Sequence, residues 1–359
     1  MLEVGKSGLR LALAMALAIT GPQAAFAQGK AKGQGAANQY KANTDNREGA
    51  LNSYVNMDTD DPAAQMELLL QETYATQQRA IENQFILQYG DRIRMDNLNY
   101  NSSGELIPAH VFKPKVMVPG RRYPAVVLLH GGFHERFDQW NFRMVEAMVS
   151  KGYIVIFPEY RGSRGFGSAI YQNDYGVTDT ADVIASGKYI ASQPFVDPER
   201  VAIVGESRGG MLTLLSIQQA PKLFKAAVDI VGLTDFVAYM AYKPEYRRAE
   251  IANTNPSFKG QLPDRNLPAY MAVSPINFVD KIETPLLVMA TTGDKIAPLS
   301  LHTGRLLDAL KARGKVHESK IYENAPGGHT FMHGDTPEQA DAKQRVFAWL
   351  EKYMGDPGK

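Results

Sequence analysis

The hydrophobic and polar positions of this chain follow two alternating patterns over most of its length. Short, continuous apolar runs predict buried strands, and longer segments with an apolar residue every three or four positions predict helices that are apolar on one face. The expected strands are 85–95, 106–112, 125–129, 153–157, 201–206, 226–231, 286–290 and 316–322. The expected helices are 61–84, 138–151, 179–192, 301–312, one after Ser207 and one from Thr336 through Leu350. This alternation predicts an α/β fold, a mostly parallel, twisted sheet of about eight strands with helices on both faces.

The first residues depart from this alternation. Two cationic residues precede an apolar run over 11–19, which is too short to span a bilayer, and Ala25-Phe26-Ala27 supplies small residues suited to cleavage. We therefore expect residues 1–27 to be a secretory signal peptide cleaved near Ala27. A buried N-terminal helix is the alternative for the same run. The expected location of the protein is periplasmic or secreted, with no stable membrane span after cleavage.

The segment that follows, 28–60, is rich in Gly, Ala, Asn, Gln and Lys. It lacks the apolar side chains that would offset the entropy of ordering, so we expect a disordered tether. Asp61-Pro62 combines a cap with a proline in the first turn and predicts the start of the helix over 61–84. This helix is expected to lie against the domain at 85–355. A contact between two copies of the chain is the alternative, and the oligomeric state stays open.

The segment Val201–Gly210, which reads V-A-I-V-G-E-S-R-G-G, carries the strongest chemical signal. A buried strand runs directly into a sharp turn with Ser207 at its apex, and a helix follows until Pro221. This order is the nucleophile elbow of an α/β-hydrolase. The glycines two positions before and after the serine fit the turn because a side chain there would collide with it.

A serine hydroxyl needs an imidazole to take its proton and a carboxylate to orient that imidazole. In this fold the three residues follow along the chain in the order serine, acid, histidine. Asp294 follows an expected strand, and His329 lies in a Gly-Gly loop after the last strand. We therefore expect Ser207, Asp294 and His329 to form a catalytic triad. The weaker alternatives for the acid and the base are Asp235, Asp280 and His333.

The tetrapeptide His130-Gly131-Gly132-Phe133 directly follows the strand expected at 125–129. Glycines at this position allow backbone N–H groups to approach the negative charge that develops on a carbonyl oxygen. We expect Gly131 and Gly132 to form an oxyanion hole, with the N–H of Arg208, the residue after the nucleophile, as the second donor. His130 is expected to be a wall of this loop.

Composition and charge exclude several other kinds of site. The 359 residues carry a net charge of +1, which gives no indication of a nucleic-acid partner. The chain has no cysteine, so disulfides, a thiol nucleophile and cysteine metal sites are excluded. The histidines show no metal-ligand spacing and no glycine-rich phosphate loop precedes a helix, so no metal and no cofactor is expected.

From about residue 85 to 355 the chain resembles the catalytic domain of the prolyl oligopeptidase family of serine peptidases. The similarity is strongest to the bacterial dipeptidyl-aminopeptidase and acylaminoacyl-peptidase branch. Besides the loops named above, it rests on Pro158–Gly167, P-E-Y-R-G-S-R-G-F-G, where Glu159 replaces the asparagine usual in the family signature. The resemblance implies the triad named above, and it implies that Tyr160 and Arg161 help to shape the site.

Members of that family usually carry a β-propeller of several hundred residues before the catalytic domain. Here about sixty residues separate the expected signal peptide from the sheet, so we expect no propeller in this chain.

The insertion at about 236–272 is expected to form a small cap. It places the rings of Phe236, Tyr239, Tyr242 and Tyr246 beside Lys243, Arg247 and Arg248. One interpretation is a pair of amphipathic helices that bury the rings. The other is an aromatic pocket rimmed by positive charge, suited to an acyl or aryl group with a nearby carboxylate. The expected substrate-binding residues are His130, Phe133, Tyr160, Arg161, Tyr239 and Tyr242.

Together these features predict a serine hydrolase that cleaves peptide or amide bonds of small peptides or acyl-amino acids through an acyl-enzyme intermediate. A carboxylesterase acting on small acyl or aryl esters is the first alternative, and the missing propeller favours it. A non-catalytic binding protein on a hydrolase fold is the second, and the presence of all three triad residues disfavours it. The expected partner is a small-molecule or short-peptide substrate.

Overall fold

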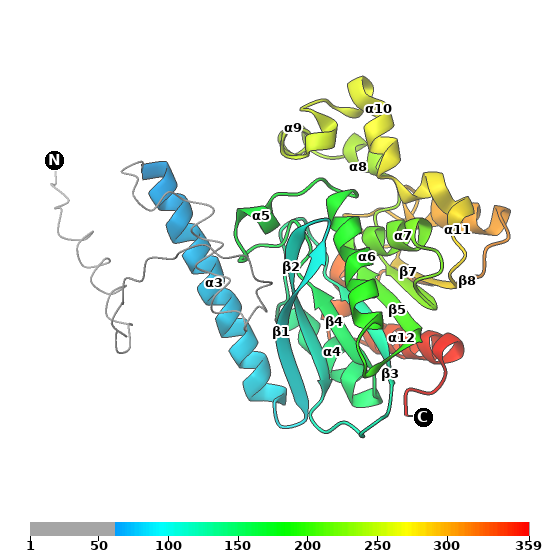
Figure 1. Cartoon of the computed structure of the whole chain (residues 1–359). Coiled ribbons are helices and arrows are strands. Elements are labelled where there is room, and N and C mark those ends of the chain that lie inside the picture. The colour runs from blue at the N-terminus through cyan, green and yellow to red at the C-terminus, as the bar shows by residue number, and fades with distance from the viewer. Residues whose placement is uncertain (1–61, 359) are drawn as a thin grey trace. The chain divides into compact units, whose positions relative to one another are not determined.

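An eight-stranded sheet organises residues 62–358, the part of the chain that the computed structural model describes (Figure 1). The strands are β1 (Ile93–Ser102), β2 (Glu105–Pro114), β3 (Tyr123–Leu129), β4 (Ile154–Pro158), β5 (Val196–Glu206), β6 (Ala226–Ile230), β7 (Leu286–Thr291) and β8 (His317–Tyr322). Their order across the sheet is β1-β2-β4-β3-β5-β6-β7-β8. The signal peptide and the tether expected at 1–60 lie outside the described residues and stay predictions.

The sheet is antiparallel at one side and parallel over the rest. β2 pairs antiparallel with both β1 and β4, whereas every pairing from β4 through β8 is parallel. β3 is buried along its whole length, as expected for a parallel strand covered on both faces. β5, the strand before Ser207, lies between β3 and β6 near the middle of the sheet. The predicted fold class, a mostly parallel sheet of about eight strands, is confirmed.

Helices cover both faces of this sheet. The apolar cluster on one face includes side chains of α3 (Pro62–Tyr89), α4 (Gln139–Lys151) and α12 (Pro337–Met354). The cluster on the other face includes α6 (Thr178–Ala191), α7 (Arg208–Gln219) and α11 (Thr303–Ala312). Successive side chains of a strand point to opposite faces, and β3 accordingly contributes Val126 and Leu128 to the first cluster and Val127 and Leu129 to the second.

The strand predicted at 85–95 starts only at Ile93 and runs on to Ser102, and the helix predicted over 61–84 extends further. α3 continues to Tyr89, and β1 starts only at Ile93. Phe85 and Tyr89 are four residues apart on one helix face, with ring centroids 5.0 Å apart. Phe85 is fully buried against three further rings, those of Phe112, Phe137 and Phe142. Helical spacing places both rings in this cluster, and that packing decides the conformation.

The insertion after β6 forms a helical cap, which stands beyond one end of the sheet (Figure 1). It consists of α8 (Phe236–Ala241), α9 (Glu245–Thr254), a 3-10 turn η1 (Pro256–Phe258) and α10 (Pro263–Ala272), and η2 (Pro275–Lys281) leads back to β7. Phe258 stacks on Tyr270 with ring centroids 3.9 Å apart, and the cap's apolar cluster includes Met211 and Leu215 of α7. The cap is therefore fixed to the helix that begins at Ser207.

Two short helices complete the described elements, α5 (Ser168–Tyr171) and the 3-10 helix η3 (Gly328–His333). Within 62–358 no helix combines the length and the apolar character needed to cross a membrane.

Candidate active site

Ser207 lies at the turn between β5 and α7 in a conformation that most side chains avoid. Its φ is 58° and its ψ is −116°, and it is the residue immediately before the helix. The backbone N–H of Ser207 donates to the carbonyl of Ile230 in β6 at 2.8 Å, so the neighbouring strand holds the turn. This geometry is that of the predicted nucleophile elbow.

The glycines around the serine are required by close contacts between backbones. A Cβ at Gly205 would lie 2.1 Å from the carbonyl oxygen of Gly209. A Cβ at Gly209 would lie 2.6 Å from the carbonyl oxygen of His130. The steric reason given for both positions from the sequence is therefore correct, and the second glycine also allows the loop after β3 to approach.

The three predicted triad residues meet at the carboxyl ends of β5 and β7. The Nε2 atom of His329 lies 2.7 Å from the hydroxyl of Ser207, and its Nδ1 lies 2.7 Å from Oδ2 of Asp294. The other carboxylate oxygen of Asp294 accepts the N–H groups of Ile296 and Ala297, each at 2.8 Å. Because a carboxylate only accepts, Nδ1 carries the proton and Nε2 is left to accept the proton of the serine.

The alternative acids and base are held elsewhere. Asp235 caps α8 through the N–H of Ala238 and forms an ion pair with Arg305. The carbonyl of Asp280 accepts a hydrogen bond from Lys315. Neither aspartate is the partner of His329.

His333, the alternative base, pairs with Glu206, the residue just before the nucleophile, at 3.0 Å. It also stacks on Trp140, with ring centroids 5.3 Å apart. This contact connects η3, which carries His329, to the elbow. The sequence did not reveal that His333 pairs with Glu206. The only available signal was that His333 lies four residues after His329.

The loop after β3 lies directly against the nucleophile. A Cβ at Gly131 would be 3.2 Å from Cβ of Ser207 and 3.7 Å from its hydroxyl oxygen. Gly132 has a φ of +70°, a conformation that favours glycine. Arg208 is the first residue of α7, where the helix offers no carbonyl to its N–H group. Backbone donors are thus available on both sides of the serine hydroxyl.

The side chain of Arg208 has a structural task that the sequence did not reveal. It is 2% exposed and forms an ion pair with the fully buried Asp179 at the start of α6. Its guanidinium also donates to the carbonyls of Gly132 at 3.2 Å and Phe133 at 2.7 Å. Burial lowers the pKa of Arg208, but the charge of Asp179, the hydrogen bond to it and the nearby Tyr160 and Tyr175 together outweigh burial and raise it. Arg208 therefore fixes the loop after β3 from inside the protein.

Three of the expected substrate-binding residues support the site from behind. Tyr160 is fully buried, and its hydroxyl donates to the carbonyl of His130 at 2.6 Å. The rings of Tyr160 and His130 stack with centroids 4.2 Å apart, and burial lowers the pKa of His130 to about 4. Arg161 forms two side-chain hydrogen bonds with Asp182. These contacts let Tyr160 and Arg161 shape the loops around the site, as the resemblance implies, and the burial of His130 and Tyr160 leaves little of either side chain for a substrate to touch. A direct contact of Arg161 with a substrate stays a prediction.

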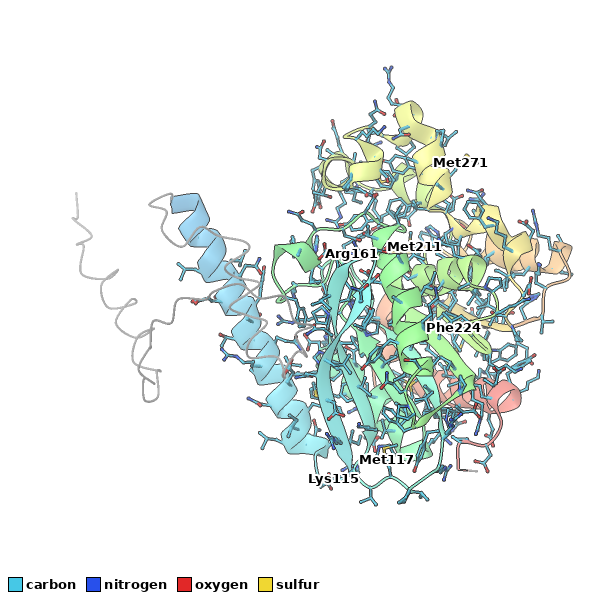
Figure 2. All side chains as sticks on the ribbon, viewed as in Figure 1. Lys115, Met117, Arg161, Met211, Phe224 and Met271 are labelled. Atoms are coloured by element: carbon cyan, nitrogen blue, oxygen red, sulfur yellow. The ribbon has the colours of Figure 1, made fainter. Side chains whose placement is uncertain are left out.

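The other three expected residues form an aromatic group where the cap, with Tyr239 and Tyr242, meets the loop after β3, with Phe133. The rings of Phe133 and Tyr239 have centroids 6.2 Å apart, and those of Tyr239 and Tyr242 lie 5.8 Å apart. The hydroxyl of Tyr242 donates to the carbonyl of Ile296 at 2.7 Å. Figure 2 shows Met211 at the end of the sheet that faces the cap and Met271 within the cap.

A buried acid beside the elbow was also missed. Asp229 in β6 is fully buried, and neither of its oxygens has a side-chain partner among the described residues. A Cβ at Gly210 would lie 2.2 Å from one of these oxygens, and a Cβ at Gly232 would lie 2.1 Å from it. Burial raises the pKa of Asp229 to about 7. The second glycine after Ser207 therefore makes room for this carboxyl group.

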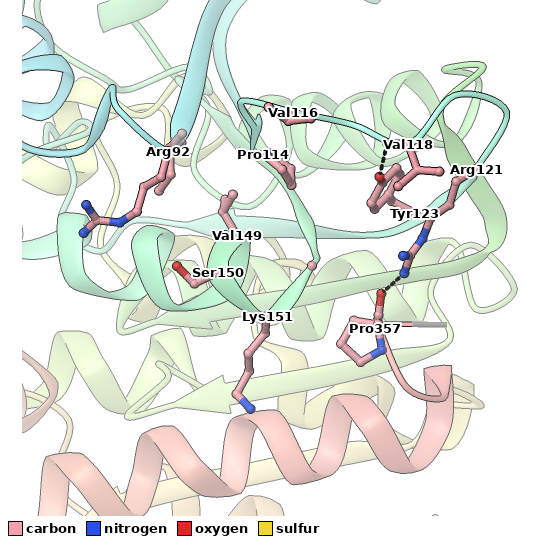
Figure 3. Close-up of a pocket in the computed structure, with 13 residues that line it drawn as sticks. Arg92, Pro114, Val116, Val118, Arg121, Tyr123, Val149, Ser150, Lys151 and Pro357 are labelled. Carbon is pink, nitrogen blue, oxygen red and sulfur yellow. Dashed lines mark hydrogen bonds between the residues drawn. The ribbon is translucent and has the colours of Figure 1, made fainter.

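A pocket of about 410 Å³ lies at the opposite ends of the strands (Figure 3). It is lined by residues that include Tyr123, where β3 begins, and Gly152, just before β4. Figure 3 shows Arg121 donating to the carbonyl of Pro357 at its border. Open α/β sheets bind their ligands at the carboxyl ends of the strands, so we assign the site to the triad and not to this pocket. Within 62–358, no group of three His, Asp or Glu side chains is placed to hold a metal ion.

Comparison with known proteins supports this assignment. The pattern of the prolyl oligopeptidase family matches residues 136–357. The chain is 26% identical over 259 residues to the uncharacterized peptidase YuxL of Bacillus subtilis, covering 70% of this chain and 38% of that protein. It is 29% identical over 255 residues to acylamino-acid-releasing enzyme 1 of Oryza sativa, covering 64% of this chain and 30% of the enzyme.

Among solved structures, a puromycin-hydrolyzing peptidase of Mycobacterium tuberculosis superimposes with a TM-score of 0.61 at 26% identity. The match covers 74% of this chain and 39% of that one. The chain thus spans less than half the length of these relatives.

Proposed function

Because this chain belongs to the prolyl oligopeptidase family, we propose that it is a serine peptidase that cleaves amide bonds of small peptides or acyl-amino acids through an acyl-enzyme intermediate. The observation that carries the proposal is the pair of 2.7 Å contacts that join Ser207, His329 and Asp294.

In the proposed mechanism, His329 takes the proton of the Ser207 hydroxyl as the oxygen attacks the carbonyl carbon. Asp294 holds the imidazole in the required tautomer and stabilises its positive charge. The N–H groups of the Gly131–Gly132 loop and of Arg208 bind the developing oxyanion. His329 then gives the proton to the leaving amine, and a water molecule, activated by the same imidazole, releases the acyl group.

Replacing Ser207 by alanine tests the proposal. We expect turnover to fall by about 10³-fold or more, since the nucleophile is removed. We also expect a fluorophosphonate probe to label the native protein and not Ser207→Ala. Ser192→Ala, which removes an exposed hydroxyl at the end of α6, is the control and should be labelled like the native protein. A folded native protein that the probe does not label would favour the non-catalytic alternative.

The carboxylesterase alternative uses the same catalytic residues, so only the choice of substrate, an amide or an ester, distinguishes it from the peptidase. Rates should be compared on an aminoacyl p-nitroanilide and the p-nitrophenyl ester of the same aminoacyl group. The proposal expects both to be cleaved. Ester cleavage with no detectable amide cleavage would replace the peptidase by the esterase.

We further propose that the protein is exported to the periplasm or secreted, on the basis of the cationic start, the apolar run and the small residues at 25–27. Cell fractionation and sequencing of the N-terminus of the exported protein would test this. A protein that stays in the cytoplasm with residues 1–27 attached would contradict it.

A further inference from the structure

Two cations of the cap rest on the aromatic group. The ammonium of Lys243 lies 4.3 Å from the ring centroid of Tyr239 and 4.8 Å from that of Tyr242. The guanidinium of Arg247, in the first turn of α9, lies 5.1 Å from the ring centroid of Phe133. Both cations are half-buried. Each cation thus lies over a ring face and keeps part of its surface in solvent.

The same rings contact the loops that carry the catalytic groups. Phe133 directly follows Gly132, and its carbonyl accepts a hydrogen bond from Arg208 at 2.7 Å. Tyr242 bonds to the carbonyl of Ile296, two residues after Asp294. Arg247 therefore borders the site on the side of the oxyanion loop. Lys243 borders it on the side of the acid loop.

The positive charge of this pair is incompletely balanced. Arg247 forms an ion pair with Glu250 at 2.6 Å, whereas Lys243 forms no ion pair with any carboxylate of the described residues. Burial lowers the pKa of Lys243, and the neighbouring charge of Arg247 lowers it further. An anion bound between the two side chains would relieve both effects, because it restores a favourable partner to a partly desolvated cation.

We propose that Lys243 and Arg247 bind a carboxylate of the substrate, so that short peptides or acyl-amino acids with a free carboxylate are cleaved in preference to neutral analogues. This inference rests on the proposed function, because it concerns the substrate of the same Ser207 site. A guanidinium can form two parallel hydrogen bonds with a carboxylate, and an ammonium adds a third donor.

Two matched substrate pairs test the preference on either side of the scissile bond. The first pair is a short N-acyl peptide with a C-terminal acid and the same peptide with a C-terminal amide. The second is an N-succinyl and an N-acetyl aminoacyl p-nitroanilide. Each pair differs in one carboxylate, so the ratio of kcat/KM within the pair measures its recognition. We expect a ratio of about 10 or more in favour of the anion for at least one pair.

Variants assign the preference to the two cations. Lys243→Gln and Arg247→Gln should each reduce the ratio several-fold, whereas Lys243→Arg, which keeps the charge, should retain most of it. Arg265→Gln removes an exposed cation from α10 in the same cap and is the matched control, with the ratio unchanged. Because the binding is between charges, the ratio should also fall as salt is raised.

The outcomes separate this inference from the proposed function. Equal cleavage of the anionic and neutral members of both pairs, or a preference that both glutamine variants keep, would overturn the carboxylate site and leave the serine peptidase intact. Failure to cleave any member, together with no labelling of Ser207, would overturn both.

Discussion

Ser207 and its immediate neighbours show how single residues determine this site. The positive φ of the serine persists because β6 holds its N–H group, and Gly205 and Gly209 leave room for the turn. The residue before the serine, Glu206, forms an ion pair with His333. The ion pair therefore couples the histidine-bearing η3 to the nucleophile.

This ion pair predicts a pH dependence. Burial lowers the pKa of His333, but its hydrogen bond to Glu206 and the charge of that carboxylate outweigh burial, so the pKa lies above the usual 6.5. A group whose pKa rises on folding stabilises the fold fully below its unfolded pKa, and this contribution is lost as the pH rises through the folded pKa. We therefore expect the contact to stabilise η3 fully below about pH 6.5 and to be lost at higher pH.

An NMR titration of the His333 ring measures this pKa directly. In Glu206→Gln the pKa should fall, because burial then acts without the opposing charge. A His333 pKa that is the same in both proteins would show that Glu206 does not hold the imidazolium.

The triad could be predicted residue by residue, and its supporting residues could not. Chain order in this fold and the glycines of the elbow identify Ser207, Asp294 and His329 without coordinates. The partner of Arg208 is Asp179, which lies 29 positions away and belongs to another helix. The sequence does show that Arg208 is the only charged residue of α7, which indicates that it needs a partner. Only the packing of α6 on α7 shows that this partner is Asp179.

At the level of secondary-structure elements, Arg208 and Asp179 join α7, α6 and the loop after β3. Replacing one member of a buried ion pair leaves the other charge without compensation, which costs about 3–5 kcal/mol. We expect Arg208→Met to lower the free energy of unfolding by about this amount, measured by denaturant titration. The double variant Arg208→Met with Asp179→Leu should recover a large part of the loss, because no buried charge remains. A double variant as unstable as the single one would contradict this account.

Most elements were predictable because their ends carry local signals. Gly152 ends α4 in the left-handed conformation, and Asp138 caps its start. Ser103 and Gly104 both have positive φ in the turn between β1 and β2, a conformation that turn residues such as glycine favour. α3 also ends before a glycine, Gly90, whose N–H donates to the carbonyl of Ile86 at 2.8 Å, but the apolar run over 85–95 predicts a strand. The burial of Phe85 against rings of β2 and α4 decides for the helix.

In the whole molecule, α3 is part of the catalytic core. Phe85 packs against rings of β2 and α4, and Arg136, beside the oxyanion loop, donates to the carbonyl of Tyr74 in α3 at 2.8 Å. The helix thus supports both the edge of the sheet and the loop after β3. Among the described residues, α3 therefore lies against the domain at 85–355, as expected.

Truncating this contact predicts a large loss of stability. Phe85→Ala removes a ring that is 0% exposed and leaves a cavity, so we expect the free energy of unfolding to fall by about 3–5 kcal/mol. Leu87→Ala, on the exposed side of the same helix, is the control and should change it by less than about 0.5 kcal/mol. Denaturant titration of both variants measures the difference. Equal stability of the two variants would mean that α3 contributes little to the core.

The edge strand β8 has a neighbour on one side only among the described strands. Its exposed positions carry Glu318 beside Ser319, and Lys320 is half-buried. Charges on an open edge oppose the docking of a foreign strand. Since β8 precedes the loop that leads to His329, we expect charges on this edge also to oppose aggregation next to the catalytic base.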